Sequence, residues 1–388
     1  MILTDLRIMT MDKPGTIERG FIRFDHGRIT EISSGDPPDD DENVNCGGLT
    51  LMPGFIDAHT HIGIAEDSID FEGDDTNEDS DPVTPQMRAL DGINPFDRCF
   101  SEARAAGITT AAVAPGSANP IGGQICVLKT AGKRVDSMLV KAPAAIKFAL
   151  GENPKSTYHA KNLAPVTRMA TAALIRETLY KAKRYADDMN AAEADDELDP
   201  PEYDLKSESL LPLLRGEIPA HFHAHRADDI FTAVRIAQEF SLKFVIIHCT
   251  DGHLIADELS EIGVPAVVGP SLTDRCKPEL RGQSIENPAI LAAAGVKIAL
   301  TTDHPVTPLQ YLPLCAEVAT RNGLDREAAL RAMTVNPAEI LGISDRVGSL
   351  AVGKDADFVL VEGDPLSGKV KAVFIDGKLV SGKLPKDE

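Results

Sequence analysis

Histidine pairs and one aspartate are the residues of this chain whose types and spacing suit the binding of a metal ion. His59 and His61 lie two positions apart in the segment DAHTH, which continues an apolar stretch after Pro53-Gly54. Alternate residues of a strand point to the same face, so both imidazoles are directed to one side. Imidazole nitrogen is a common ligand of zinc and other divalent ions. By itself this pair is weak evidence for a metal site.

Three later segments add groups of the same kind. Residues 221–225 (HFHAH) place three histidines on one strand face, His248 ends the apolar segment KFVIIH, and Asp303 follows the apolar segment VKIALTT. The outer two of the three histidines are too far apart along a strand to share one ion, so we expect His221 to belong to the core. A buried carboxylate such as Asp303 is costly unless it is paired or bound to a metal. Together these groups predict a metal site.

The elements that would position these groups alternate between strands and helices. Helical periodicity is clear over residues 228–240 and 325–333, and a helix is expected near 171–189. Strands with interleaved helices predict an α/β fold, a (β/α)₈ barrel of the TIM type with parallel strands, whose sites lie at the C-terminal strand ends. The candidate ligands fall near such ends. The predicted strands cover 55–61, 108–114, 125–130, 144–150, 218–225, 243–249, 265–268 and 297–302.

Two connections depart from a regular barrel pattern. Residues 131–143, between the third and fourth predicted strands, leave too little chain for a helix with its loops. Residues 151–217 are a long insertion, and long segments on the site-bearing side of a barrel often act as a lid or a specificity wall.

Both ends of the chain have a different, strand-like pattern. A His26-Gly27 turn interrupts alternating residues near the start, and Asp376-Gly377 separates two apolar segments near the end. Asp-Gly in that setting is a strong hairpin signal. We therefore predict one small β-sandwich domain formed by residues 1–53 and 345–388, and a metal-binding barrel domain over 54–344 with the insertion at 151–217.

Composition bounds the partners and the compartment. The formal net charge is −21, which argues against nucleic acid and anionic membranes as partners. The chain has neither a long apolar span nor a secretory-signal pattern, and its 6 cysteines are scattered, as is typical of a cytoplasmic protein with reduced thiols. We expect a small-molecule substrate; a homo-oligomer is compatible with such a barrel. The acidic segment 72–81 suits a solvated loop, with a lid or cation-attracting rim as the alternative.

The order of these motifs resembles the amidohydrolase superfamily, over nearly the whole chain. The resemblance is nearest to the branch related to imidazolonepropionase and Xaa-Pro dipeptidases. It implies a metal-dependent hydrolase with one or two divalent ions, zinc being the first expectation and Fe, Mn, Co or Ni the alternatives. The motifs that carry the resemblance are PGFIDAHTH, GITT, HAH, IIHCTDGH, TTDHP and, near the end, NPAEILGI and VGSLAVGKDADFVLVEGDPL.

The resemblance also implies roles for individual residues. Asp303 matches a ligand that also acts as the catalytic base, and His225 then supports a ligand or faces the substrate. His248 or His225 is expected to orient the scissile carbonyl. The positions that match ligands of the family are His59, His61, His223, His248 and Asp303.

The fourth strand decides between one ion and two in this family. Binuclear relatives place a carboxylated lysine or a glutamate there, which bridges the two ions. This sequence offers Lys147 within the predicted strand and Glu152 just beyond its end. An unmodified lysine would repel two neighbouring cations, whereas a carbamate reverses the sign of the charge. Strand position favours Lys147 over Glu152.

Several functions remain open at this point. Deaminases of the superfamily carry a glutamate three residues after the fifth-strand histidine, where this chain has Arg226. That favours hydrolysis of an amide-like bond in a dipeptide, an N-acyl compound or a cyclic amide. A mononuclear deaminase or ring hydrolase is the enzymatic alternative, and a non-catalytic barrel scaffold is the alternative of another class. Arg275 and Lys277 are candidates for binding a substrate carboxylate, unless they are solvated surface residues.

Overall fold

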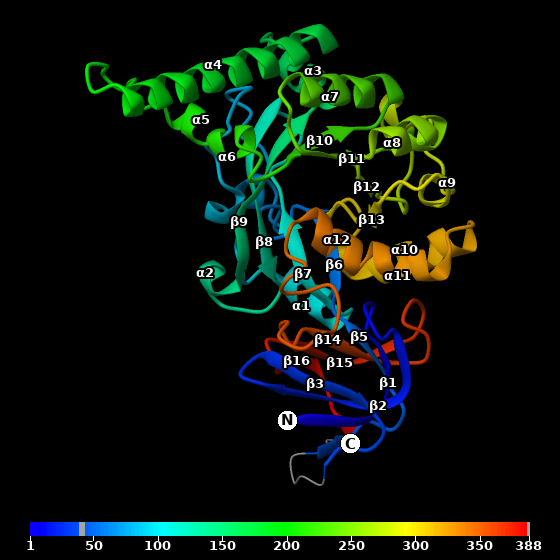
Figure 1. The fold of residues 1–388 in the computed structure, drawn as a ribbon. Coiled ribbons are helices and arrows are strands. Elements are labelled where there is room, and N and C mark those ends of the chain that lie inside the picture. Colours follow the sequence, from blue (N-terminus) through cyan, green and yellow to red (C-terminus); the bar gives the residue numbers. More distant parts are fainter. Residues whose placement is uncertain (39–42, 386–388) are drawn as a thin grey trace.

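Two eight-stranded sheets organise the protein, as seen in a computed structural model that describes residues 1–38 and 43–385 (Figure 1). The first sheet combines strands from the two ends of the chain, and the second contains all strands between them. The strands of the first sheet are β1 (Ile2–Met9), β2 (Thr16–Asp25), β3 (Arg28–Ser34), β4 (Asn43–Asn45), β5 (Thr50–Pro53), β14 (Phe358–Glu362), β15 (Lys369–Ile375) and β16 (Lys378–Gly382).

The second sheet is nearly closed into a barrel. Its strands follow one another in chain order from β6 to β13, so the first and last strands form its two edges. These edges meet where the His61 backbone N–H donates to the His304 carbonyl at 2.9 Å and the Thr301 hydroxyl donates to the His59 carbonyl at 2.6 Å. The strands are β6 (Phe55–Thr60), β7 (Ile108–Val113), β8 (Ile121–Lys129), β9 (Leu139–Ala149), β10 (Ala220–Ala224), β11 (Phe244–His248), β12 (Ala266–Val268) and β13 (Ile298–Leu300).

Helices follow most barrel strands, which confirms a mixed α/β fold with a barrel-like sheet. The helices predicted at 228–240 and 325–333 are α7 (Ala227–Glu239) and α11 (Arg326–Ala332). Asp325 caps α11, because its carboxylate accepts from the Ala328 backbone N–H at 3.0 Å. The other helices outside the insertion are α1 (Arg98–Ala105), α2 (Val135–Met138), α8 (Ala256–Ile262), α9 (Asn287–Ala293), α10 (Leu312–Arg321) and α12 (Val335–Ile340), with 3₁₀ turns η1 (Phe71–Gly73), η2 (Ala89–Asp91), η3 (Gly252–Leu254), η4 (Pro278–Leu280) and η5 (Leu309–Tyr311).

The third strand of the barrel corrects the prediction of eight parallel strands. β8 pairs antiparallel with both β7 and β9, whereas the remaining neighbours in this sheet pair parallel. The physical reason is the short connection already noted in the sequence: between the end of β8 at Lys129 and the start of β9 at Leu139 the chain holds only the one-turn helix α2, too little to cross the length of the barrel. β8 therefore runs in the opposite direction to its neighbours, and Lys129 at its C-terminal end lies at the end of the barrel that faces the first sheet.

The long insertion forms a helical layer at the opposite end of the barrel from the first sheet (Figure 1). The helix predicted near 171–189 is α4, which extends further in both directions. The helices of the insertion are α3 (Glu152–Ala160), α4 (Arg168–Ala194), α5 (Leu205–Glu208) and α6 (Leu211–Leu214). Among the described residues, no helix is both long and apolar enough to span a bilayer.

The first sheet is one bent sheet, in contrast to the predicted two-sheet sandwich. The bend is possible because β1 carries register shifts against β2 and a positive φ of 53° at Asp5. Its two halves face each other: the Phe24 ring of β2 lies 5.3 Å from Phe358 of β14 and 5.6 Å from Phe374 of β15. Both predicted hairpin turns are present, at His26-Gly27 and Asp376-Gly377. We propose the division into residues 1–53 with 345–388 and residues 54–344 on this basis.

A buried ion cluster joins the barrel to this sheet. The Lys129 ammonium contacts Asp355 at 2.6 Å and Asp357 at 3.1 Å, and also pairs with Asp376. Arg346 contacts Asp355 at 2.8 Å from another side. The side chains of Lys129, Asp355 and Asp357 are at most 4% exposed, so each charge depends on the others for compensation. The antiparallel course of β8 is what brings Lys129 to this junction.

Replacing Lys129 by methionine is expected to destabilise the protein by about 3–5 kcal/mol, because it leaves buried carboxylates without their central cation. Urea unfolding of the variant and of wild type measures this difference. Lys133→Met, at an exposed position in the same connection, is the matched control and should change stability little. A loss below about 1 kcal/mol for Lys129→Met, the scale of an exposed pair, would contradict this role.

Candidate metal centre

Two groups of possible metal ligands lie at the C-terminal end of the barrel. The first contains His59 of β6, His61 just after β6 and Asp303 after β13. The second contains His223 of β10, His225 just after β10 and His248 of β11. In each group the candidate ligand atoms lie within 4.8 Å of one another. The rings of His59 and His248, 5.5 Å apart, link the two groups.

The spacing of the first group fits ligands that share one cation. The Nε2 atoms of His59 and His61 each lie 3.5 Å from Asp303 Oδ1. His61 donates its Nδ1–H to the Ala114 carbonyl at 2.7 Å, so the neutral ring directs the Nε2 lone pair at this carboxylate. Two electron-rich atoms facing each other in a buried site repel. Ligands on one tetrahedral zinc ion are about 3.4 Å apart for bonds of ~2.1 Å, so a divalent ion fits here.

Backbone strain accompanies two of the candidate ligands, one from each group. Asp303 and His248 adopt positive φ values of 51° and 72°, which are uncommon for residues other than glycine. Both residues lie at or just after the ends of barrel strands, where the chain turns outward. Strain of this kind is retained where surrounding structure enforces it, often at functional sites.

Charge states in the site favour metal binding at neutral pH. Burial, with the nearby charge of Lys147, holds the pKa of His59 well below its ordinary value, and burial lowers the pKa of His248 to about 4. Burial raises the pKa of Asp303, but its interactions with His248, His61 and Lys147 outweigh this effect and the net pKa is lowered. The imidazoles of His59 and His248 are therefore neutral and the Asp303 carboxylate is ionised, as ligands must be.

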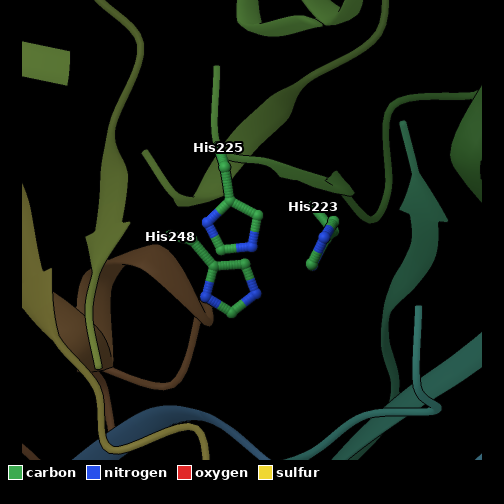
Figure 2. Close-up of side chains that lie close together, drawn as sticks. All are labelled: His223, His225 and His248. Carbon is green, nitrogen blue, oxygen red and sulfur yellow. The ribbon is translucent and has the colours of Figure 1, made fainter. Parts of the chain in front are cut away.

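The second group is more tightly packed. The His225 and His248 rings stack at 4.6 Å, and the His223 ring lies 4.5 Å from His248 and nearly perpendicular to it (Figure 2). His248 donates Nδ1–H to the Gly269 carbonyl at 2.8 Å. In the neutral ring Nε2 then carries only a lone pair, so it can bind a cation or accept a hydrogen bond but cannot donate one. That favours a ligand role for His248 over donation to a substrate carbonyl.

The two fourth-strand candidates have different surroundings. Lys147 is fully buried, and its Nζ lies 3.0 Å from His59 Nε2. Burial lowers its pKa to about 7. Glu152 instead exchanges two hydrogen bonds with Glu279: its carboxylate accepts from the Glu279 N–H at 3.1 Å, and its own N–H donates to Glu279 at 2.9 Å. Lys147 therefore lies beside His59, whereas Glu152 is paired with Glu279.

Other sequence candidates also have clear positions. His221 is fully buried, as expected of a core position, and neither of its ring nitrogens has a hydrogen-bond partner. Arg226 forms a two-pronged pair with Asp228, with both distances at 2.9 Å, on the first turn of α7. Lys277 lines the cavity beside the histidines, whereas Arg275 donates to the Gln283 carbonyl at 2.7 Å.

Sequence reasoning missed two buried carboxylates. Asp57 accepts from the His59 N–H at 3.1 Å and from the Thr302 N–H and hydroxyl at 2.9 and 2.7 Å. Asp57 thus connects the segment that carries His59 to the segment that carries Asp303. The position of an aspartate inside an apolar strand could have identified it from the sequence. Glu279, 2% exposed, lies in η4 beside the histidines. No spacing pattern in the sequence connects it to them.

A cavity of about 430 Å³ opens onto both groups. The acidic segment 72–81 forms part of its wall through Asp74, Thr76 and Asn77. The same segment is attached to the insertion by two ion pairs of 2.6 Å, Asp79 with Lys161 and Asp81 with Lys206. It is therefore a fixed rim of the cavity. A larger cavity, about 730 Å³, is lined by residues of β1 and α11 and by none of the histidines.

Comparisons with protein families, solved structures and known sequences each find proteins similar to this chain. The model of the amidohydrolase family matches residues 217–380. The crystal structure of an amidohydrolase from Thermotoga maritima MSB8 superposes with a TM-score of 0.95 at 42% identity, covering 98% of this chain and 100% of that one. An imidazolonepropionase from Agrobacterium fabrum is 26% identical over 90% of this chain and 86% of its own length.

A third relative is much longer than this chain. The amidohydrolase tasK of Hapsidospora irregularis is 29% identical over 92% of this chain, but the match spans only 39% of that protein. Its likeness therefore concerns one part of a larger protein.

Proposed function

Because the chain belongs to the amidohydrolase family, we propose that it hydrolyses an amide-like carbon–nitrogen bond of a small molecule at the His59–His61–Asp303 centre. Members of the family are hydrolases of such bonds and generally bind a divalent metal. The observation that supports this proposal most directly is the convergence of two imidazole Nε2 atoms on Asp303 Oδ1 at 3.5 Å each. Zinc is the first candidate, and Fe, Mn, Co or Ni suit the same ligands.

In the proposed mechanism the bound ion supplies positive charge, which makes water more acidic and a carbonyl carbon more electrophilic. Asp303, ionised and next to both histidines, accepts the proton of the attacking water and passes it to the leaving nitrogen. Asp57 accepts hydrogen bonds from His59 and from Thr302, the residue before Asp303, and thereby holds His59 and Asp303 in position relative to each other. The cavity admits a substrate while its walls limit the water around the reacting bond.

The tautomer of His225 determines its role. Thr250 Oγ1 lies 2.7 Å from His225 Nδ1 and can either donate to it or accept from it. If the hydroxyl donates, His225 Nε2 carries the proton and can orient the scissile carbonyl. If it accepts, Nε2 offers a lone pair to a cation.

Lys147 is the residue we propose for carboxylation. Its Nζ lies 3.0 Å from His59 Nε2, where an ammonium would repel an ion bound to that nitrogen. With its pKa lowered to about 7 by burial, part of the population is neutral amine at neutral pH, the form that can add carbon dioxide. The resulting carbamate would contribute negative charge between the two groups of ligands.

Cyclic amides are the first substrates to examine, because imidazolonepropionases are among the relatives. Dipeptides and N-acyl amino acids follow from the same bond type. Deamination receives less support, since Arg226 occupies the position of the deaminase glutamate and pairs with Asp228. Because the members of the family are hydrolases, a non-catalytic scaffold is the less favoured alternative.

Metal removal tests the proposed function. A panel of cyclic amides, N-acyl amino acids and dipeptides is incubated with the protein as purified, after chelation, and after adding back zinc or manganese. We expect hydrolysis of one substrate class to be lost on chelation and restored by the metal, with an amine and a carboxylate as products. Ammonia as the only small product would instead indicate a deaminase, and turnover that chelation leaves unchanged would contradict the proposal.

A further inference from the structure

The cavity of about 730 Å³ lies apart from the metal centre, between the first sheet and the barrel helices α11 and α12. Figure 1 shows these elements where the barrel meets the first sheet. The volume is within the range of about 300–1,000 Å³ that is usual for small-molecule sites. Residues 344–354 close one side, and the Leu350 backbone N–H joins them to the β1–β2 hairpin by donating to the Thr10 carbonyl at 2.8 Å. The walls therefore come from distant parts of the chain and are held together by the fold.

The charged lining of this cavity is opposite in sign to the chain as a whole. The sequence has 39 lysines and arginines against 60 aspartates and glutamates. The cationic side chains of the lining are Arg7, Lys13, Arg326, Arg331 and Lys354, and its carboxylates are Asp12, Glu327 and Glu339. Of these carboxylates, Glu339 is already paired at 2.7 Å with Lys297, which is not part of the lining. Positive charge is thus concentrated here on an acidic protein, and such a concavity attracts anions.

Two of the cations have no counter-charge. Arg331 is half-buried at the C-terminal end of α11, and its guanidinium makes neither a hydrogen bond nor an ion pair with any residue that the structure describes. The Lys354 ammonium donates to the buried Ser349 hydroxyl at 2.7 Å but pairs with no carboxylate of residues 1–38 and 43–385. Burial holds the pKa of Lys354 below its ordinary value. A partly desolvated cation without a partner is costly, and a bound anion would offset that cost.

Two arginines of the lining are held in place by carboxylates outside it. Arg7 Nε donates to Glu18 Oε2 at 3.0 Å. In Arg326 both Nε and Nη2 donate to the same oxygen of Asp364, at 3.1 and 2.7 Å. A guanidinium has five N–H donors, so each of these arginines retains donors for a further acceptor. The two pairs therefore fix the side chains without using the whole fork.

We propose that this cavity binds a small organic oxyanion, a phosphate ester or a carboxylate, whose charge Arg331 and Lys354 neutralise. Guanidinium forks bind both kinds of oxyanion with two parallel hydrogen bonds, and an ammonium adds a compact charge. The inference goes beyond the proposed function, because none of the histidines of the metal centre lines this cavity.

The test measures binding directly, by isothermal titration calorimetry of the full chain with its metal as purified. The probes are ribose 5-phosphate and succinate at low ionic strength, with ribose as the uncharged control. We expect at least one of the two anions to bind, more weakly as salt is added, and ribose not to bind. Tighter binding of ribose 5-phosphate would identify a phosphate ester as the ligand class, and tighter binding of succinate a carboxylate.

Substitutions of opposite sign locate the bound anion. Arg331→Met and Lys354→Met should each weaken binding about tenfold, the scale of one charge-assisted hydrogen bond. Glu327→Gln removes an exposed carboxylate of the lining and should strengthen binding about threefold. Because its side chain is exposed, this variant is expected to fold normally.

Arg184→Met is the matched control, since Arg184 is exposed on α4 and outside the cavity. It should bind the anion as wild type does, and thermal unfolding checks that every variant is folded. Failure of both anions to bind at millimolar concentration would overturn the proposal, and so would equal binding of ribose. Affinities unchanged by Arg331→Met and Lys354→Met, or not raised by Glu327→Gln, would place the anion elsewhere and also overturn it. Since no activity is measured, such a failure would leave the proposed function intact.

Discussion

Replacing Asp303 by asparagine is expected to reduce turnover by about 10²–10⁴-fold, the range for loss of a general base. Asparagine has nearly the same shape but no ionised oxygen, so it can neither accept the proton of water nor balance the charge of an ion. The fold should persist, because asparagine tolerates the positive φ of 51° at this position better than most residues. Turnover is measured with the best substrate from the metal-dependence panel, beside the thermal unfolding midpoint.

Asp97→Asn serves as a matched control for the same chemical change. Asp97 is also buried, but it caps α1 by accepting from the Cys99 N–H at 3.2 Å, and an asparagine can accept there equally well. Its turnover should remain near that of wild type. If Asp303→Asn retained turnover within tenfold of wild type, Asp303 would not be the base. Metal content of the variant separates loss of the base from loss of the ion.

Removing both first-strand imidazoles is expected to empty the first centre. In His59→Ala with His61→Ala, only Asp303 of this group remains, and a single carboxylate does not hold a divalent ion in competition with water. The content of tightly bound metal should fall by one ion per chain, and hydrolysis should be abolished. Elemental analysis of protein purified without chelators makes the measurement, and circular dichroism verifies the fold.

His26→Ala is the control for general effects of losing histidine, since the His26 side chain is 94% exposed at a hairpin turn. It should retain all of its metal. Full occupancy in the double variant would refute the ligand assignment of His59 and His61. Loss of both ions would mean that the two groups bind metal cooperatively, as expected if carboxylated Lys147 bridges them.

Local patterns in the sequence determined much of the barrel and most of the proposed ligands. Strands end at His248 and just before Asp303, and alternation alone placed His59 with His61 and His223 with His225. Because parallel barrel strands present their C-terminal ends at one edge, side chains far apart in the chain could be expected to converge. The helix capped by Asp325 and the Asp376-Gly377 turn were predictable because short-range hydrogen bonds and turn geometry specify them.

Only the tertiary structure decided the features that depend on contacts between distant segments. The reversed direction of β8 follows from where a short connection can reach, and it brings Lys129 to Asp355 and Asp357. Our proposal of Lys147 over Glu152 depends on the 3.0 Å distance between Lys147 Nζ and His59 Nε2, which no strand pattern encodes. Glu279 had no signal in the sequence at all, since its η4 segment meets the histidines only through the packing of the whole barrel. Periodicity reports which face of an element is buried, but which side chains meet across that face depends on how the elements are connected and packed.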